Sequence, residues 1–186
     1  FWDKLGHAGY RVYAIFPHLC YPVWSTPARM AARSPVSDEA QAWPPSLLDA
    51  YPDPDVLPGV RGFPDRTVAG MRTYARRLAD QARADAAFAL RLMRRDAWDL
   101  FFVYASTLDA ISHFFWGYAD RADDGYVADH PLAGVLLDAY KQYDALVGQY
   151  LDAVDEDVTV MVVSDHGHGA RPATLVNVNE VLRRAG

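Results

Sequence analysis

Cysteine and long apolar runs are the two features that this sequence most lacks. Cys20 is the single cysteine among 186 residues, so no disulfide can form within the chain. We expect Cys20 to behave as a small buried hydrophobic residue. No apolar run approaches the ~20 residues that a membrane helix needs. The sequence therefore predicts no membrane segment in this part of the protein.

Positive charge is also scarce, because 18 basic side chains stand against 24 acidic ones and the net charge is −6. We therefore expect no nucleic-acid partner, since binding a polyanion requires a basic surface. Hydrophobic residues make up 51% of the chain and charged residues 23%, a composition typical of globular proteins that bury a core. The sequence leaves the oligomeric state open. It also leaves the compartment open, and slightly favours the cytoplasm.

Helical and strand patterns alternate along the chain. Periodic apolar positions predict helices over residues 1–8, 65–95 (one helix or two), 131–154 and 177–185, and a helix that starts near Asp109. Runs of apolar residues predict strands over 11–16, 99–105 and 158–163, and a polar loop is expected over 117–130. The last two strands are of the type buried on both faces of a parallel sheet. This order predicts an α/β fold with a mostly parallel sheet flanked by helices.

Prolines interrupt the chain repeatedly between residues 22 and 64. Few periodic stretches lie between them, so we expect a long and largely irregular excursion. Excursions of this length usually cover a site or bind a substrate. A segment that merely follows the surface is the alternative, and the sequence does not decide between the two.

Asp109 and His113 form the first cluster of residues that could bind a metal. They are four positions apart after a predicted buried strand, so a helix would place both on one face, one turn apart. A carboxylate and an imidazole in that arrangement can reach the same cation. The alternative is structural, with Asp109 as a helix N-cap and His113 as a hydrogen-bonded core histidine.

The second cluster, Ser-Asp-His-Gly-His-Gly over residues 164–169, follows the predicted strand 158–163. Asp165 and His166 are adjacent, and they can converge on one ion only if the backbone there is irregular. Gly167 and Gly169 permit such a backbone. His168 could be a ligand or a donor to one, but we expect it to face solvent or substrate, as a weak candidate for substrate binding.

Taken together, the two clusters lie at the carboxyl ends of strands, where open α/β sheets bind their ligands. We predict that Asp109, His113, Asp165 and His166 hold two divalent metal ions. Aspartate oxygen and histidine nitrogen suit zinc, which we expect first, and also manganese. Two such ions could clamp the attacking and leaving oxygens of a phosphoryl displacement. The other histidines (His7, His18 and His130) are interpreted as structural.

These motifs make the chain similar to a known superfamily. The segments FWDKLGHAGYRV, TLDAISHFFW, YKQYDALVGQYL, VMVVSDHGHG and NVNEVLRRAG occur in that order. These segments and their order resemble those of the alkaline phosphatase superfamily. Within it, the chain looks most like the type I phosphodiesterase/nucleotide pyrophosphatase branch and the predicted phosphohydrolase/phosphomutase group. The resemblance implies that residues 1–186 are the central portion of one alkaline phosphatase-like domain, with its N- and C-terminal parts missing.

The resemblance also implies roles. Asp109 and His113 would hold one metal, completed by a distal histidine. Asp165 and His166 would hold the other, completed by an N-terminal aspartate and by a Thr or Ser nucleophile that forms a covalent phospho-enzyme. The nucleophile and those two further ligands would lie outside this chain, so the segment alone is expected to be inactive. Ser25-Thr26-Pro27 is superficially similar to a nucleophile motif but follows the wrong strand.

A metal-dependent hydrolase acting on a small phosphate mono- or diester is therefore the expected function. A phosphomutase using the same site is one alternative, although residues 22–64 look short for a domain that encloses a sugar. A non-catalytic module, which uses the scaffold for metal binding or structure, is the other. A sulfatase is disfavoured because Cys20, in LCYPV, does not look like the modified residue of that branch.

Overall fold

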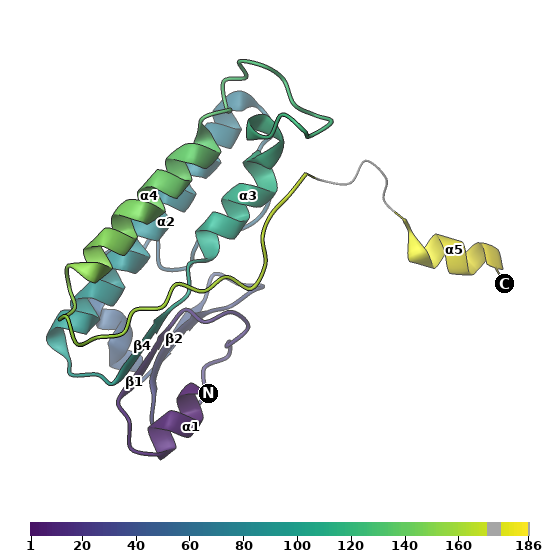
Figure 1. Ribbon diagram of the computed structural model, residues 1–186. Coiled ribbons are helices and arrows are strands. Elements are labelled where there is room, and N and C mark those ends of the chain that lie inside the picture. Colours follow the sequence, from purple (N-terminus) through teal and green to yellow (C-terminus); the bar gives the residue numbers. More distant parts are fainter. Residues whose placement is uncertain (171–175, 186) are drawn as a thin grey trace.

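One four-stranded sheet organises the chain in the computed structural model, which describes residues 1–170 and 176–185 (Figure 1). The strands are β1 (Val12–Ile15), β2 (Arg29–Arg33), β3 (Ala40–Trp43) and β4 (Leu100–Val103), in the order β3-β2-β1-β4. β1 pairs in parallel with both β2 and β4, whereas β3 runs antiparallel to β2. The prediction of an α/β fold with a mostly parallel sheet is confirmed.

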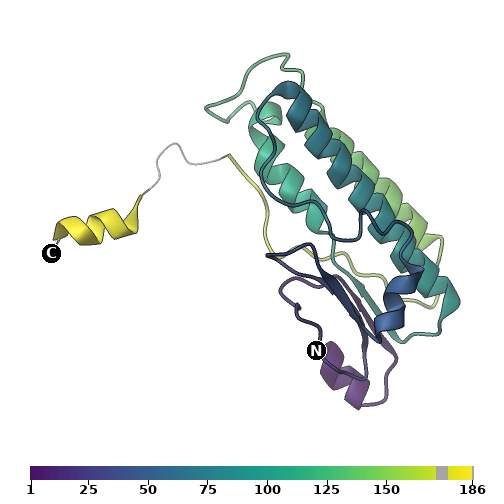
Figure 2. The same cartoon turned by 180° about the vertical axis from the view of Figure 1, so that it is seen from behind.

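Helices cover both faces of this sheet. They are α1 (Trp2–His7), the 3-10 helix η1 (Pro45–Ala50), α2 (Val68–Arg95), α3 (Ser106–Ala119), α4 (Val135–Leu151) and α5 (Val178–Ala185). Figures 1 and 2 show α2, α3 and α4 gathered on one side of the sheet and α1 on the other. α5 stands apart from this body in both views and has no buried residue. None of the helices in the described ranges is long and apolar enough to cross a membrane.

The core is built around β1, whose four residues are all buried. Tyr13 and Ile15 point to one face and pack in the same cluster as Phe88 and Leu92 of α2. On β4, Phe102 contacts Trp2 of α1, with ring centres 5.7 Å apart. Because successive residues of a strand face opposite sides, the short β1 strand is sandwiched between α2 and α1.

Helix α2 is continuous, which settles the choice between one helix and two. The Thr67 hydroxyl caps its start by accepting a hydrogen bond from the Gly70 N–H. Arg94 and Arg95 lie in the last turn, where their positive charge stabilises the negative end of the helix dipole. Its other buried positions, including Met71 and Leu78, pack against α3 and α4. The helix therefore joins the sheet to the two helices that carry or support the candidate site.

A buried ion pair fastens α2 to β2. Arg33 Nη2 lies 2.5 Å from Asp85 Oδ1, and each side chain is only 12% exposed. The Tyr51 hydroxyl donates to the same Asp85 oxygen at 2.7 Å, and Arg33 Nε donates to the Leu57 carbonyl at 2.6 Å. Both charged groups are thus compensated, which is the condition for tolerating them in the interior.

The expectation of irregular structure over 22–64 is wrong in part, because β2, β3 and η1 lie within this segment. The core of β2 is Met30-Ala31-Ala32, which lacks the β-branched residues that usually mark a strand. Pairing with β1 and burial of all three residues impose the extended backbone there. The tertiary contacts, rather than local preference, determine this strand.

The predicted strand over 158–163 does not form. The structure assigns no strand there, and the side chains are open to solvent, with Val162 80% exposed. A strand needs a hydrogen-bonded neighbour, and β4 has none on its outer edge among the described residues. The helix predicted over 131–154 is also shorter than expected, because turns occupy residues 131–134 before α4 begins.

We predict that Asp85→Ala lowers the free energy of unfolding by about 3–5 kcal/mol, because it leaves the Arg33 guanidinium buried without its partner. Urea denaturation followed by circular dichroism measures this change. Asp80→Ala is the matched control on the same helix, since Asp80 pairs with Arg83 at the surface and such pairs contribute roughly 0–1 kcal/mol. Equal losses for the two variants would contradict the role given to the buried pair.

Candidate metal centre

The site begins where two parallel strands end at the same edge of the sheet. β4 ends at Val103 in register with Ile15, the last residue of β1, and α3 starts at Ser106. Ile111 and Phe115 bury one face of α3, which turns the opposite face outward. Asp109 and His113 lie on that outer face, with Asp109 Oδ1 3.4 Å from His113 Nε2. The strand end and the helix packing together place this pair.

His168 approaches the same pair from a distant part of the sequence. Its ring centre lies 4.8 Å from that of His113 and 5.1 Å from that of Trp116. Each of three residues, Asp109, His113 and His168, offers one ligand atom. These three atoms all lie within 4.8 Å of one another. One carboxylate oxygen and two imidazole nitrogens are a donor set that zinc accepts, with room for a further ligand. The residues present therefore fit a divalent metal.

Asp165 and His166 stay outside this three-residue group. Asp165 Oδ2 lies 3.8 Å from His166 Nε2, and the Asp165 side chain is 81% exposed. The His166 ring N–H donates to the Gly167 carbonyl, with Nδ1 2.8 Å from the oxygen. His166 nevertheless lines the same cavity as His113 and His168. The structure thus brings the two predicted clusters to one rim, with His168 nearest to the Asp109 and His113 pair.

Electrostatic effects link the two clusters. Burial, followed by the positive charge of His113, lowers the pKa of His168 and favours the neutral imidazole that metals bind. The hydrogen bond to the Gly167 carbonyl, then the carboxylates of Asp165 and Asp109, raise the pKa of His166. Burial, and then the negative charges of Asp109 and Asp165, raise the pKa of Tyr104. One phenol thus responds to both carboxylates.

Tyr104 was not predicted to lie near the site, although the charges of Asp109 and Asp165 affect its pKa. Tyr104 directly follows β4, His18 follows β1, and their ring centres are 5.6 Å apart. The position of Tyr104 after a parallel strand was the available signal. Thr26, by contrast, precedes β2 at the opposite edge and donates to Asp3 Oδ1 at 2.5 Å. This location does not favour Thr26 as a nucleophile.

The spacing of Asp109 and His113 is not sufficient by itself. Asp3 and His7 in α1 have the same spacing, with His7 Nδ1 3.9 Å from Asp3 Oδ2. No third donor joins that pair in the described ranges. The arrival of His168 from the 164–169 segment therefore distinguishes the α3 pair.

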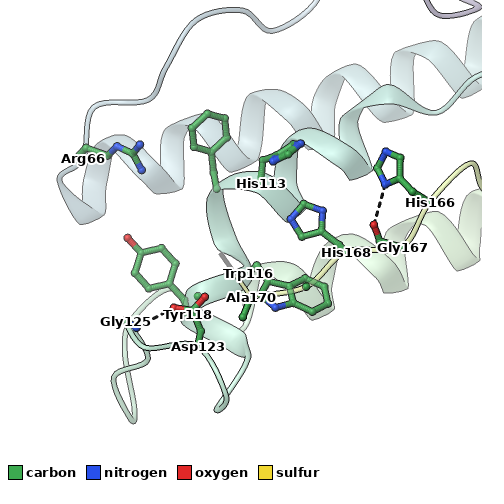
Figure 3. Close-up of a pocket in the computed structure, with 13 residues that line it drawn as sticks. Arg66, His113, Trp116, Tyr118, Asp123, Gly125, His166, Gly167, His168 and Ala170 are labelled. Atoms are coloured by element: carbon green, nitrogen blue, oxygen red, sulfur yellow. Dashed lines mark hydrogen bonds between the residues drawn. The ribbon is translucent and has the colours of Figure 1, made fainter. Parts of the chain in front are cut away.

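A cavity of about 570 Å³ extends from the candidate metal centre along the outer side of α3 (Figure 3). Its volume is in the range of small-molecule sites. His113, His166 and His168 lie at one end, and the aromatic rings of Phe114, Trp116 and Tyr118 line its walls. Arg66 and Asp123 also line it. A substrate could thus contact α3 beyond the ligands themselves.

Comparison with known proteins decides the family. Residues 1–186 match the family described as "Type I phosphodiesterase / nucleotide pyrophosphatase". The chain belongs to this family. No curated protein and no solved structure matches the chain. Membership in the type I phosphodiesterase family supports a hydrolase of the phosphodiesterase or pyrophosphatase kind with a small-molecule substrate, and the family is generally metal-dependent.

We predict that His168→Ala lowers the zinc affinity of this phosphodiesterase-family protein by at least about tenfold, because even groups that only support a ligand have effects of that size. Competition with a chelating dye at constant pH measures the affinity. His7→Ala is the control, since it removes a histidine from a pair with the same spacing but no third donor. Unchanged affinity in His168→Ala would remove this residue from the centre.

Proposed function

We propose that the full-length protein hydrolyses phosphate mono- or diesters with the help of two divalent metal ions. Zinc is the expected metal, and manganese is the alternative. Asp109 and His113 would hold one ion, and Asp165 and His166 the other. The nucleophile would come from outside residues 1–186 and form a covalent phospho-enzyme. The observation that carries the proposal is the convergence of α3 and the 164–169 segment at the carboxyl edge of the sheet, in a chain of this family.

His168 changes the proposed ligand set in one respect. Because it lies closer to Asp109 and His113 than the sequence suggests, we assign it to the same ion as that pair. Its lowered pKa keeps the ring neutral and able to donate a nitrogen lone pair. His168 would thus be a metal ligand rather than a substrate contact.

The metal ions, the aspartates and the aromatic side chains would have different roles at this site. Bound cations would supply positive charge to the phosphoryl oxygens and make a bound water more acidic. Asp109 and Asp165 bring negative charge that offsets the charge of the two cations. The aromatic cavity walls would orient the ester group beside the centre and exclude part of the solvent.

We predict that Asp165→Ala lowers kcat/KM for bis-p-nitrophenyl phosphate at least about 100-fold in the zinc- or manganese-loaded full-length protein, since a metal contributes several kcal/mol to such reactions. Release of p-nitrophenol measures the rate. Asp138→Ala is the control, because Asp138 is an exposed residue of α4 that does not line the cavity.

Undiminished hydrolysis in Asp165→Ala would reject the proposed site. Chromatography of a sugar phosphate incubated with the protein separates the competing activities. Inorganic phosphate as the product supports hydrolysis, whereas an isomeric sugar phosphate would indicate a phosphomutase. Absence of both products, together with retained zinc binding, would favour a non-catalytic module.

A further inference from the structure

The cavity beside the candidate metal centre has a second charged end, formed by Arg66. This residue directly precedes Thr67, the N-cap of α2, and lies across the cavity from His168 and His166 (Figure 3). Of the Lys and Arg residues in the described ranges, Arg66 is the one that lines this cavity. The cavity therefore has histidines that could hold a metal at one end and a permanent cation at the other.

The exposed Arg66 guanidinium lies over an aromatic ring and is not neutralised. Its central carbon lies 5.4 Å from the centre of the Phe114 ring. Phe114 is itself fixed by edge contacts with Tyr74 at 5.2 Å and Phe63 at 6.0 Å. No carboxylate of the described residues lies within ion-pair distance of Arg66. The N–H groups of Arg66 thus remain available to a ligand.

Asp123, the carboxylate that lines the same cavity, does not fill this role. Its Oδ1 accepts a hydrogen bond from the Gly125 N–H at 2.9 Å, within its own loop. It lies beside Gly117, where an added Cβ would come within 3.1 Å of the same oxygen. The Asp123 carboxylate therefore contacts its own loop and α3. It does not pair with the Arg66 guanidinium, whose charge stays uncompensated.

The chemistry of the cavity follows from these contacts. A guanidinium presents paired N–H donors that match the two oxygens of a carboxylate or phosphate. Two aromatic rings also line the cavity, Phe114 beside Arg66 and Trp116 beside His168. A fitting ligand therefore has a flat or apolar body with an oxyanion at each end.

We propose that Arg66 determines substrate specificity by binding a second oxyanion of the substrate, while the phosphoryl group lies at the Asp109, His113 and His168 end. This inference rests on the proposed function, which it extends to substrates with two anionic groups. Phe63, at the end of the Pro-rich segment, reaches this region only through its contact with Phe114. Among the described residues, none in the range 22–64 lines the cavity, so the lining does not favour a role for the excursion in substrate binding.

A pair of non-hydrolysable ligands tests the proposal. Isothermal titration calorimetry compares phenylphosphonate with 4-carboxyphenylphosphonate on the zinc-loaded full-length protein. We expect the carboxylated ligand to bind about tenfold more tightly to the wild type, because a charge-assisted hydrogen bond increases the affinity by about that factor. Arg66→Gln should abolish this preference and leave the affinity for phenylphosphonate within about twofold.

Arg76→Gln is the matched control, because Arg76 is an exposed arginine of α2 that bonds Thr73 and does not line the cavity. It should keep the tenfold preference. Equal affinities of the wild type for the two ligands, or a preference that survives Arg66→Gln, would overturn the inference. Either result alongside normal ester hydrolysis would leave the proposed function standing. A preference that depends on Arg66 in a protein without hydrolytic activity would reject hydrolysis alone.

Discussion

The parallel pairing of β1 with β4 is the constraint on which the rest of this structure depends. It places the carboxyl ends of both strands at one edge, with Ile15 opposite Val103. The Asp109 and His113 pair follows from that edge, because Tyr104 comes directly after β4 and α3, which carries the pair, starts two residues later. Open α/β sheets bind ligands at this edge because loops and helix starts converge there.

Helix packing then determines which side of α3 faces the cavity. Ile111 and Phe115 are buried against α2 and α4, so Asp109 and His113 face outward toward His168. α2 is in turn fastened to the sheet by Phe88 and Leu92 and by the buried pair of Arg33 with Asp85. The position of the candidate metal centre is thus set by apolar packing on the far side of the helix that carries it.

The sequence predicts those features that depend on local pattern. The five α-helices, β1, β4 and the Asp109 and His113 pair could be inferred from periodicity, spacing and the order of elements. β2 could not, because its alanines acquire an extended backbone only through pairing with β1. The strand predicted over 158–163 failed for the converse reason, since its valines suit a strand but do not specify a neighbour. The proximity of His168 to His113 is likewise a tertiary contact that spacing cannot reveal.

Anomalous X-ray diffraction from crystals of the full-length protein soaked in zinc tests the central claim most directly. The account predicts a zinc peak bound by Asp109 and His113 on α3 and by a residue of the 164–169 segment, and a second peak at Asp165 and His166. Zinc bound elsewhere, with α3 and the 164–169 segment contributing no shared ligand, would contradict it.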